Sequence, residues 1–222
     1  MDVSEAVMTR RSIRAFRPEP VSKELLEEIV QKALWAPSWG NTQTWGLTVV
    51  TGEALDRIKE ENAERTKKGV APKSDLVMPT TWDEKEGGRY RELGKTLFDR
   101  LGIEREDKER RAAYYLEMAR SFGAPHMLYL HLRKEFNAYA LMDGGILLQT
   151  IALLAVERGL GTCFLAVSVL HPDVIRAHAA IPPDRVIAMG MAIGYPRLQD
   201  PVNLFDRTRG GAEDFVKWVG VD

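Results

Sequence analysis

AYALMDGGILLQTIALLAVERGLG, residues 138–161, is long and apolar enough to form a helix of about 20 residues and decides how the chain must fold. Asp143, Gly144, Gly145 and Gln149 interrupt it, so no uninterrupted part reaches the roughly 18 to 20 residues that a bilayer span requires. The pattern predicts a helix that is buried on most sides. One chain of 222 residues can hardly cover such a helix alone, so we expect a subunit interface to complete its burial.

Strands are predicted on both sides of this helix. HMLYLHL (126–132) precedes it, GTCFLAVSV (161–169) follows it, and WGLTVVTG (45–52) and DRVIAMGMAIGYP (184–196) are further candidates. Helical patterns lie between them, at 3–12, 23–36, 53–68, 88–100, 106–121 and 171–180. Strands scattered among helices predict an α+β or α/β sandwich. The least regular part is 69–123, where Gly87 and Gly88 are expected to break a helix.

Composition excludes several classes of function. The chain has 31 basic and 32 acidic side chains, a balance that argues against a nucleic-acid-binding protein. Its single cysteine, Cys163, permits no internal disulfide and fits a reducing cytoplasm. The start MDVSEAVMTRR lacks an export leader, and we expect no membrane segment and a cytoplasmic protein. The four histidines show no metal-ligand spacing, and no Walker, GxSxG or GxGxxG motif occurs.

Arginines cluster in TRRSIRAFRPEPVS (9–22). Arg10, Arg11 and Ser12 fall where the first helix is expected to end, and Arg14 follows in extended chain. Guanidinium groups and a hydroxyl that converge there would suit a phosphate, because arginine offers paired donors to anionic oxygens. The plainer interpretation, which the residues alone favour, is that these cations complement the helix dipole and pair with surface acids. A docking patch for an acidic partner is a further alternative.

Two other segments carry polar groups of interest. Arg207 and Arg209 form a second basic pair near the C-terminus, which taken alone would be a solvated loop. APSWGNTQTW (36–45) follows the second helix, and there Asn41 and Gln43 offer amides that can bind the hydrogen-bonding edge of a heterocycle. These amides could equally satisfy the local backbone.

The order RRSIRAF, APSWGNTQTW, GLGTCFLAV, GYP and the basic pair resembles the FMN-dependent nitroreductase family. The resemblance covers nearly the whole chain except about 67–123. It implies an α+β fold, a three-layer α/β sandwich with a mainly antiparallel central sheet that homodimerisation completes. It also implies that 1–222 is a single FMN-binding domain, with a variable excursion at about 67–123 that covers the substrate.

The resemblance implies roles for three groups of residues. The arginines at both ends of the chain would hold the FMN phosphate, and Arg14 would approach the pyrimidine edge of the flavin. The loop at 37–43 would reach the flavin of the other subunit. A backbone N–H of 165–167 would donate a hydrogen bond to the N5 atom of the flavin. The implied FMN-binding residues are Arg10, Arg11, Ser12, Arg14, Pro37, Ser38, Trp39, Asn41, Gln43, Leu165, Ala166, Val167, Arg207 and Arg209. The sequence departs from the family at Thr44, where proline is usual, and at Trp39, where a small residue is common.

The implied activity is reduction of nitroaromatics, quinones or a related small acceptor, with NADH or NADPH as electron donor. FMN carries the chemistry, so no catalytic side chain is expected. A reductive dehalogenase, an enone reductase or a non-catalytic flavin-binding protein are the alternatives. Tyr114, Tyr115, Met118 and Phe122 near the end of the 106–121 helix would line a substrate pocket or, alternatively, form the core face of that helix.

Overall fold

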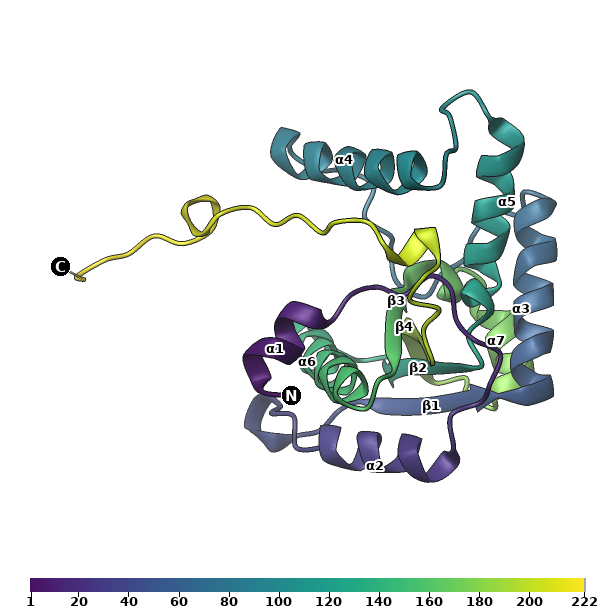
Figure 1. The fold of residues 1–222 in the computed structure, drawn as a ribbon. Coiled ribbons are helices and arrows are strands. Elements are labelled where there is room, and N and C mark those ends of the chain that lie inside the picture. Colours follow the sequence, from purple (N-terminus) through teal and green to yellow (C-terminus); the bar gives the residue numbers. More distant parts are fainter. Residues whose placement is uncertain (222) are drawn as a thin grey trace.

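The computed structural model describes residues 1–221, and in them four strands form one sheet in which every pairing is antiparallel (Figure 1). The strands are β1 (Gly46–Thr51), β2 (His126–Arg133), β3 (Gly161–Leu165) and β4 (Arg185–Gly194), in the order β1-β2-β4-β3. The two central strands, β2 and β4, are buried on both faces, which explains why their sequences are nearly continuous apolar runs.

Helices cover both faces of the sheet. They are α1 (Val3–Thr9), α2 (Lys23–Ala33), α3 (Gly52–Lys67), α4 (Glu84–Arg100), α5 (Lys108–Ala119), α6 (Ala138–Glu157) and α7 (Pro172–Ala179). Alternate residues of β2 pack on opposite sides: Leu128 and Leu130 join the core under α2 and α6, whereas Met127 and Tyr129 join the core under α3, α5 and α7. The predicted three-layer α+β sandwich is therefore confirmed, with α4 standing apart above one edge (Figure 1).

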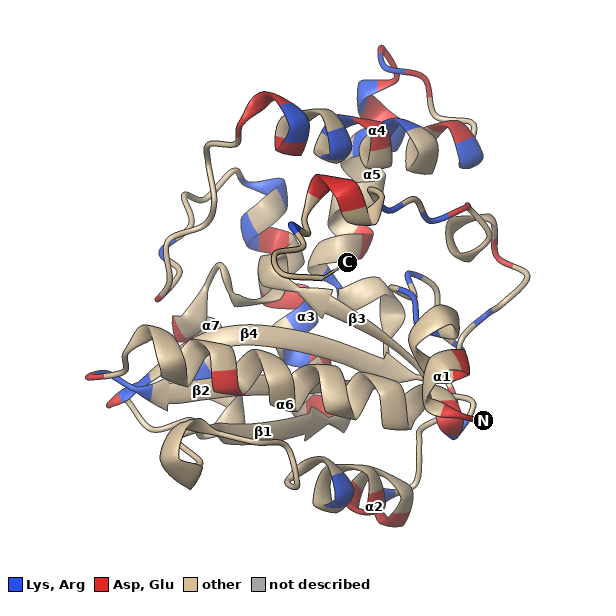
Figure 2. Cartoon of the chain, turned by 90° about the vertical axis from the view of Figure 1, so that its left-hand side faces the viewer, with Lys and Arg blue, Asp and Glu red and all other residues tan. Residues whose placement is uncertain are grey.

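The long helix α6 lies directly on β2. A Cβ at Gly144 would meet the Leu130 side chain at 2.6 Å, so the glycine permits this close approach. By length and composition alone α6 could cross a membrane, but 44% of its most apolar part is buried inside the protein. Its outer side carries Tyr139, Met142 and Ile146, which are 55%, 59% and 36% exposed and follow helical spacing. Figure 2 shows this helix crossing the sheet with almost no charge along its length.

Four predicted boundaries were wrong. The strand predicted at 161–169 ends at Leu165, and residues 166–169 form a 3₁₀ turn in which Ser168 Oγ donates to the Leu165 carbonyl at 2.7 Å. Gly87 and Gly88 lie inside α4, which begins at Glu84 behind an Asp83 capping box strong enough to start the helix before them. The first helix ends at Thr9 rather than at 12, and the second ends at Ala33 rather than at 36.

Candidate functional site

The arginine-rich segment 10–17 forms an extended strap between the sheet and the C-terminal part of the chain. On one side Ile13 N donates to the Thr162 carbonyl of β3 at 2.9 Å. On the other, Arg17 N donates to the Tyr195 carbonyl at 2.8 Å, and Ala15 accepts from Arg197 N at 3.0 Å. Because its backbone is bonded on both sides, the strap is anchored along its length, and its arginine side chains start from defined backbone positions.

Asn203 clamps the strap to the C-terminal segment, and sequence reasoning missed it. Its side chain is 2% exposed. Oδ1 accepts from Arg14 N at 2.7 Å, and Nδ2 donates to the carbonyls of Ala15 and Arg197, both at 3.0 Å. Arg11 Nη1 donates to the Asn203 carbonyl at 2.6 Å. Three of these bonds join residues 188 to 192 positions apart, so no local pattern could have revealed them.

Arg207 binds the carboxyl end of α1. Its guanidinium donates to the carbonyls of Met8 and Arg10, which α1 leaves without helical partners. One arginine therefore complements the end of the helix, which is the role that the plainer interpretation of the sequence gave to the N-terminal arginines. That arginine comes from the C-terminal pair, whereas the side chain of Arg10 makes no hydrogen bond to the described residues.

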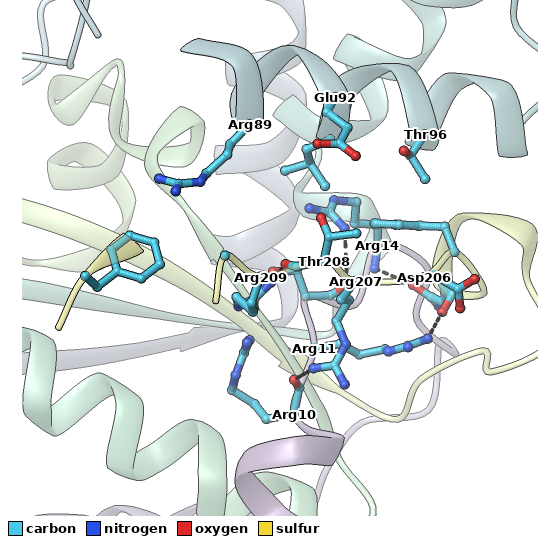
Figure 3. Close-up of a pocket in the computed structure, with 16 residues that line it drawn as sticks. Arg10, Arg11, Arg14, Arg89, Glu92, Thr96, Asp206, Arg207, Thr208 and Arg209 are labelled. Carbon is cyan, nitrogen blue, oxygen red and sulfur yellow. Dashed lines mark hydrogen bonds between the residues drawn. The ribbon is translucent and has the colours of Figure 1, made fainter. Parts of the chain in front are cut away.

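A cavity of about 570 Å³ collects the arginines from both ends of the chain (Figure 3). Six of the residues predicted from sequence line it: Arg10, Arg11, Ser12, Arg14, Arg207 and Arg209. Asn203, Phe205 and the α4 residue Arg89 are among the others, and Arg14 lies over the Phe205 ring at 5.5 Å.

This cavity concentrates positive charge. Arg89 pairs with Asp214 at 2.9 Å, but none of the five predicted arginines forms an ion pair within residues 1–221, although Glu92 and Asp206 also line the cavity. Burial and then the neighbouring Arg209 hold the pKa of Arg10 below its ordinary value. Burial, followed by the surrounding arginines, does the same to the pKa of Arg207. Like charges crowded together in this way are stabilised by a doubly charged phosphate.

The segment 165–167 lies beside the strap but is not among the residues that line this cavity. Leu165 ends β3, the same strand whose Thr162 bonds the strap, and it is buried. Ala166 and Val167 are half-buried at the start of the 3₁₀ turn. The close packing of this turn against β4 is fixed by Gly190, where a Cβ would lie 2.0 Å from Ser168 Oγ.

The loop at 37–43 is exposed and internally bonded. Ser38 Oγ accepts from Gln43 N at 3.0 Å, and the Gln43 amide donates to the carbonyl of Asn41 at 3.2 Å. Asn41 and Gln43 both adopt left-handed backbone angles, with φ of 56° and 47°. Within one chain these amides satisfy the local backbone, as one interpretation of the sequence held. The bonds also fix the shape of the loop in an outward-facing position.

The loop and the arginine cavity lie at opposite ends of α6. Trp39 N donates to the buried Asp143 carboxylate at 3.1 Å, and the Trp39 and Tyr139 rings are 6.3 Å apart, so the loop sits on the first turns of the helix. The strap bonds Thr162, which follows the other end. A helix of 20 residues is about 30 Å long. A single chain therefore does not bring Pro37, Ser38, Trp39, Asn41 and Gln43 to the arginines.

A second cavity, of about 740 Å³, lies between α4 and α5 and shares Arg14 with the first. Tyr114, Tyr115 and Met118 line it. Tyr114 also belongs to the core, as does Phe122, which agrees with the core interpretation for these two residues. That the cavity binds the substrate stays a prediction. Burial raises the pKa of Tyr114 to about 12, and its hydroxyl stays protonated.

Cys163 and the histidines take structural positions. Cys163 is buried, and burial raises the pKa of its thiol, which agrees with the packed cysteine that was predicted. His126 Nε2 accepts from Val21 N at 2.8 Å, and His131 bonds the Thr48 hydroxyl at 3.0 Å. In residues 1–221 no three His, Cys, Asp or Glu side chains gather in a group able to hold a metal ion.

Comparison with known proteins agrees with this geometry. The model of the nitroreductase family matches residues 7–195. A nitrobenzene nitroreductase of Ectopseudomonas oleovorans is 31% identical over 220 residues, which cover 98% of this chain and 96% of that protein. A 4-nitrobenzoate reductase of Pseudomonas putida is 30% identical over 226 residues, which cover 100% and 97%.

A solved structure extends the likeness to the fold. The crystal structure of the FMN- and NADPH-dependent nitroreductase NfnB from Sphigopyxis sp. strain HMH superposes with a TM-score of 0.95 at 34% identity, and the match covers 100% of both chains. The strap, the arginine cavity and the α+β sandwich are thus accompanied by sequence similarity from end to end. The chain belongs to the nitroreductase family.

Proposed function

We propose that the protein is an FMN-dependent oxidoreductase that uses NADH or NADPH to reduce nitroaromatic compounds, quinones or related small acceptors. The observation that carries this proposal is the cavity into which Arg10, Arg11, Arg14 and Arg209 project without an ion-pair partner in residues 1–221. FMN fits it, because a phosphate matches the donors and a cavity of about 570 Å³ has room for a cofactor. Relatives and the similar structure are nitroreductases, one of them dependent on FMN and NADPH.

The residues of this chain bind and orient, and bound FMN supplies the redox chemistry, taking electrons from the nicotinamide and passing them to the acceptor. Arg10 and Arg209 would hold the phosphate from two sides, while Arg207 keeps the end of α1 in place beside them. Arg14, fixed through its backbone by Asn203, presents a cation where the two cavities meet. A cation there would favour negative charge on the reduced ring of bound FMN and would so make its reduction easier.

We also propose that two copies of the chain form the functional unit. The outer side of α6 is apolar, and Val3, Met8 and Trp35 add further exposed apolar side chains near it. The C-terminal segment leaves the body as an extended arm (Figure 1), on which Phe215 and Trp218 are largely exposed. Surfaces of this kind mark protein interfaces. If the two-fold axis is perpendicular to α6, the two copies of the helix run antiparallel, and this arrangement would bring the loop of one subunit to the arginine cavity of the other.

The remaining assignments belong to the same proposal. Residues 1–222 act as one FMN-binding domain, and the excursion at about 67–123, which includes α4 and α5, covers the acceptor. Leu165, Ala166 and Val167 would offer a backbone N–H group to the flavin. A cytoplasmic location is part of the proposal, and the single free Cys163 fits a reducing compartment.

Purification and an absorption spectrum test the proposal. We expect a yellow protein. Its flavin absorbance should bleach when NADH or NADPH is added without oxygen, and it should return when a nitroaromatic compound is then added. A control reaction without protein accounts for direct reduction of the acceptor. A colourless protein that takes up no FMN on incubation would refute the cofactor assignment, and a bound flavin that NADH and NADPH leave oxidised would refute the enzymatic one.

A further inference from the structure

The cavity between α4 and α5 combines aromatic walls with an excess of positive charge. Phe98 of α4 meets Tyr114 of α5 edge-to-face, with centroids 5.3 Å apart, and Tyr115 lies 5.9 Å from Tyr114. The charged residues that line the cavity are Arg14, Arg91, Lys95, Arg105 and Arg111 against Asp99 and Glu104. Lys95 and Asp99 pair with each other at 2.5 Å, so the unpaired charge is carried mainly by arginines.

Arg111 is the arginine that this cavity fixes in place. Its Cζ lies 4.0 Å from the centroid of the Phe98 ring, a close cation–π contact. The residue is half-buried, and its guanidinium forms no ion pair or side-chain hydrogen bond within residues 1–221. Stacking leaves the in-plane N–H donors of a guanidinium free, and these donors match the two oxygens of a carboxylate. Arg91 and Arg105, by contrast, are exposed at the rim.

On the basis of the proposed function, we propose that Arg111 binds the acid group of an aromatic acceptor, and that the preferred substrates are therefore aromatic carboxylates. The Tyr114, Tyr115 and Phe98 rings supply the apolar surface for the aromatic part. Because Arg14 lines both cavities, an aromatic acid held here lies next to the site proposed for the flavin. Arg111 is thus a specificity-determining residue for the acceptor.

The test compares 4-nitrobenzoate with its methyl ester, which has the same ring and nitro group but no charge. We expect Arg111→Gln to lower kcat/KM for 4-nitrobenzoate about ten-fold, the loss typical of one charge-assisted hydrogen-bonded contact. We expect the value for the ester to change less than about two-fold, because the ester makes no such contact. Arg111→Lys keeps the charge without the planar fork and should recover part of the loss.

Binding and controls separate this role from a structural one. Calorimetric titration of oxidised, flavin-loaded protein with benzoate should show a dissociation constant about ten-fold higher in Arg111→Gln, with benzamide binding unchanged. Arg100→Gln is the matched control, since Arg100 is exposed on α4 and outside the cavity lining. The flavin content of each variant shows that it is folded.

Separate measurement of flavin reduction by NADH or NADPH and of acceptor reduction shows whether Arg111 binds the acid group of the acceptor or the phosphate of the donor. If Arg111→Gln slows reduction of the flavin by NADPH but not by NADH, and spares the acid-to-ester ratio, Arg111 binds the phosphate of the donor and the inference is wrong. An unchanged acid-to-ester ratio in an active variant also overturns it, while the nitroreductase activity stands. If the loaded protein reduces neither nitro compound, the proposed function fails instead, and the benzoate titration still decides whether the cavity binds aromatic acids.

Discussion

Replacing Arg10 by glutamine should weaken FMN binding without weakening the fold. The Arg10 side chain makes no hydrogen bond and no ion pair within residues 1–221, and burial beside Arg209 holds its pKa low. Its position is therefore unfavourable for a cation without an anion beside it, and the proposed FMN phosphate would supply that anion. Glutamine retains most of the length of the side chain and removes the charge.

Arg10→Gln should weaken FMN binding but slightly stabilise the flavin-free fold. Loss of one charge-assisted contact to the phosphate costs about 1.5–3 kcal/mol of binding free energy, which raises the dissociation constant of FMN about 10- to 150-fold. In the flavin-free protein the same change relieves repulsion among half-exposed charges, which stabilises the fold by at most about 1 kcal/mol. A residue with a purely structural role would lower stability and flavin affinity together.

Fluorescence titration of flavin-free protein with FMN measures the first quantity, and urea unfolding of the same preparation measures the second. Arg17→Gln is the control, because Arg17 is exposed, stacks on Tyr195 at 5.0 Å and lies outside the cavity lining. Its FMN affinity should equal that of the unmodified protein. An Arg10→Gln protein that binds FMN normally, or that unfolds at clearly lower urea concentration, contradicts the reasoning.

Three other perturbations have defined outcomes. Asn203→Leu removes three buried hydrogen bonds of the clamp and should lower the free energy of unfolding by about 2–4 kcal/mol, measured by urea denaturation; a loss below about 1 kcal/mol would contradict the clamp. Burial lowers the pKa values of His126, His131 and His171, so the unfolded chain binds more protons as the pH falls below about 6.5. Stability should therefore be complete above that pH and decline below it, and urea midpoints that stay level down to about pH 5 would contradict this. Met142→Glu places a charge on the exposed apolar side of α6 and should give folded monomers with little flavin by light scattering and absorbance, whereas a flavin-loaded dimer would remove α6 from the interface.

Local signals predicted the fold well. Ser22 caps the second helix by accepting from Leu25 N at 3.2 Å, and the apolar runs of the central strands lie at their predicted positions. The errors come from effects that the local pattern does not contain. Gly87 remains helical because the capping box at Asp83 outweighs its low propensity, and β3 stops early because the Ser168 hydroxyl takes the Leu165 carbonyl.

The site was predictable only as separate pieces. The arginines were visible as clusters, but their meeting depends on the clamp at Asn203, whose partners are distant in sequence. The position of the loop depends on Asp143, an acid inside an apolar helix that the sequence marks only as an interruption. Only the tertiary structure shows that the 37–43 loop and the arginines lie at opposite ends of α6.

Mixed dimers test most directly whether one flavin is held by two chains. One subunit carries Arg10→Gln and Arg209→Gln, the other carries Asn41→Ala, and differently tagged copies are co-expressed so that the mixed dimer can be isolated. In a shared site each dimer of identical variants has two damaged sites, whereas the mixed dimer has one intact site and one doubly damaged site. We therefore expect about one FMN per mixed dimer and much less in either parent. A mixed dimer as poor in flavin as both parents would show that each chain builds its site alone.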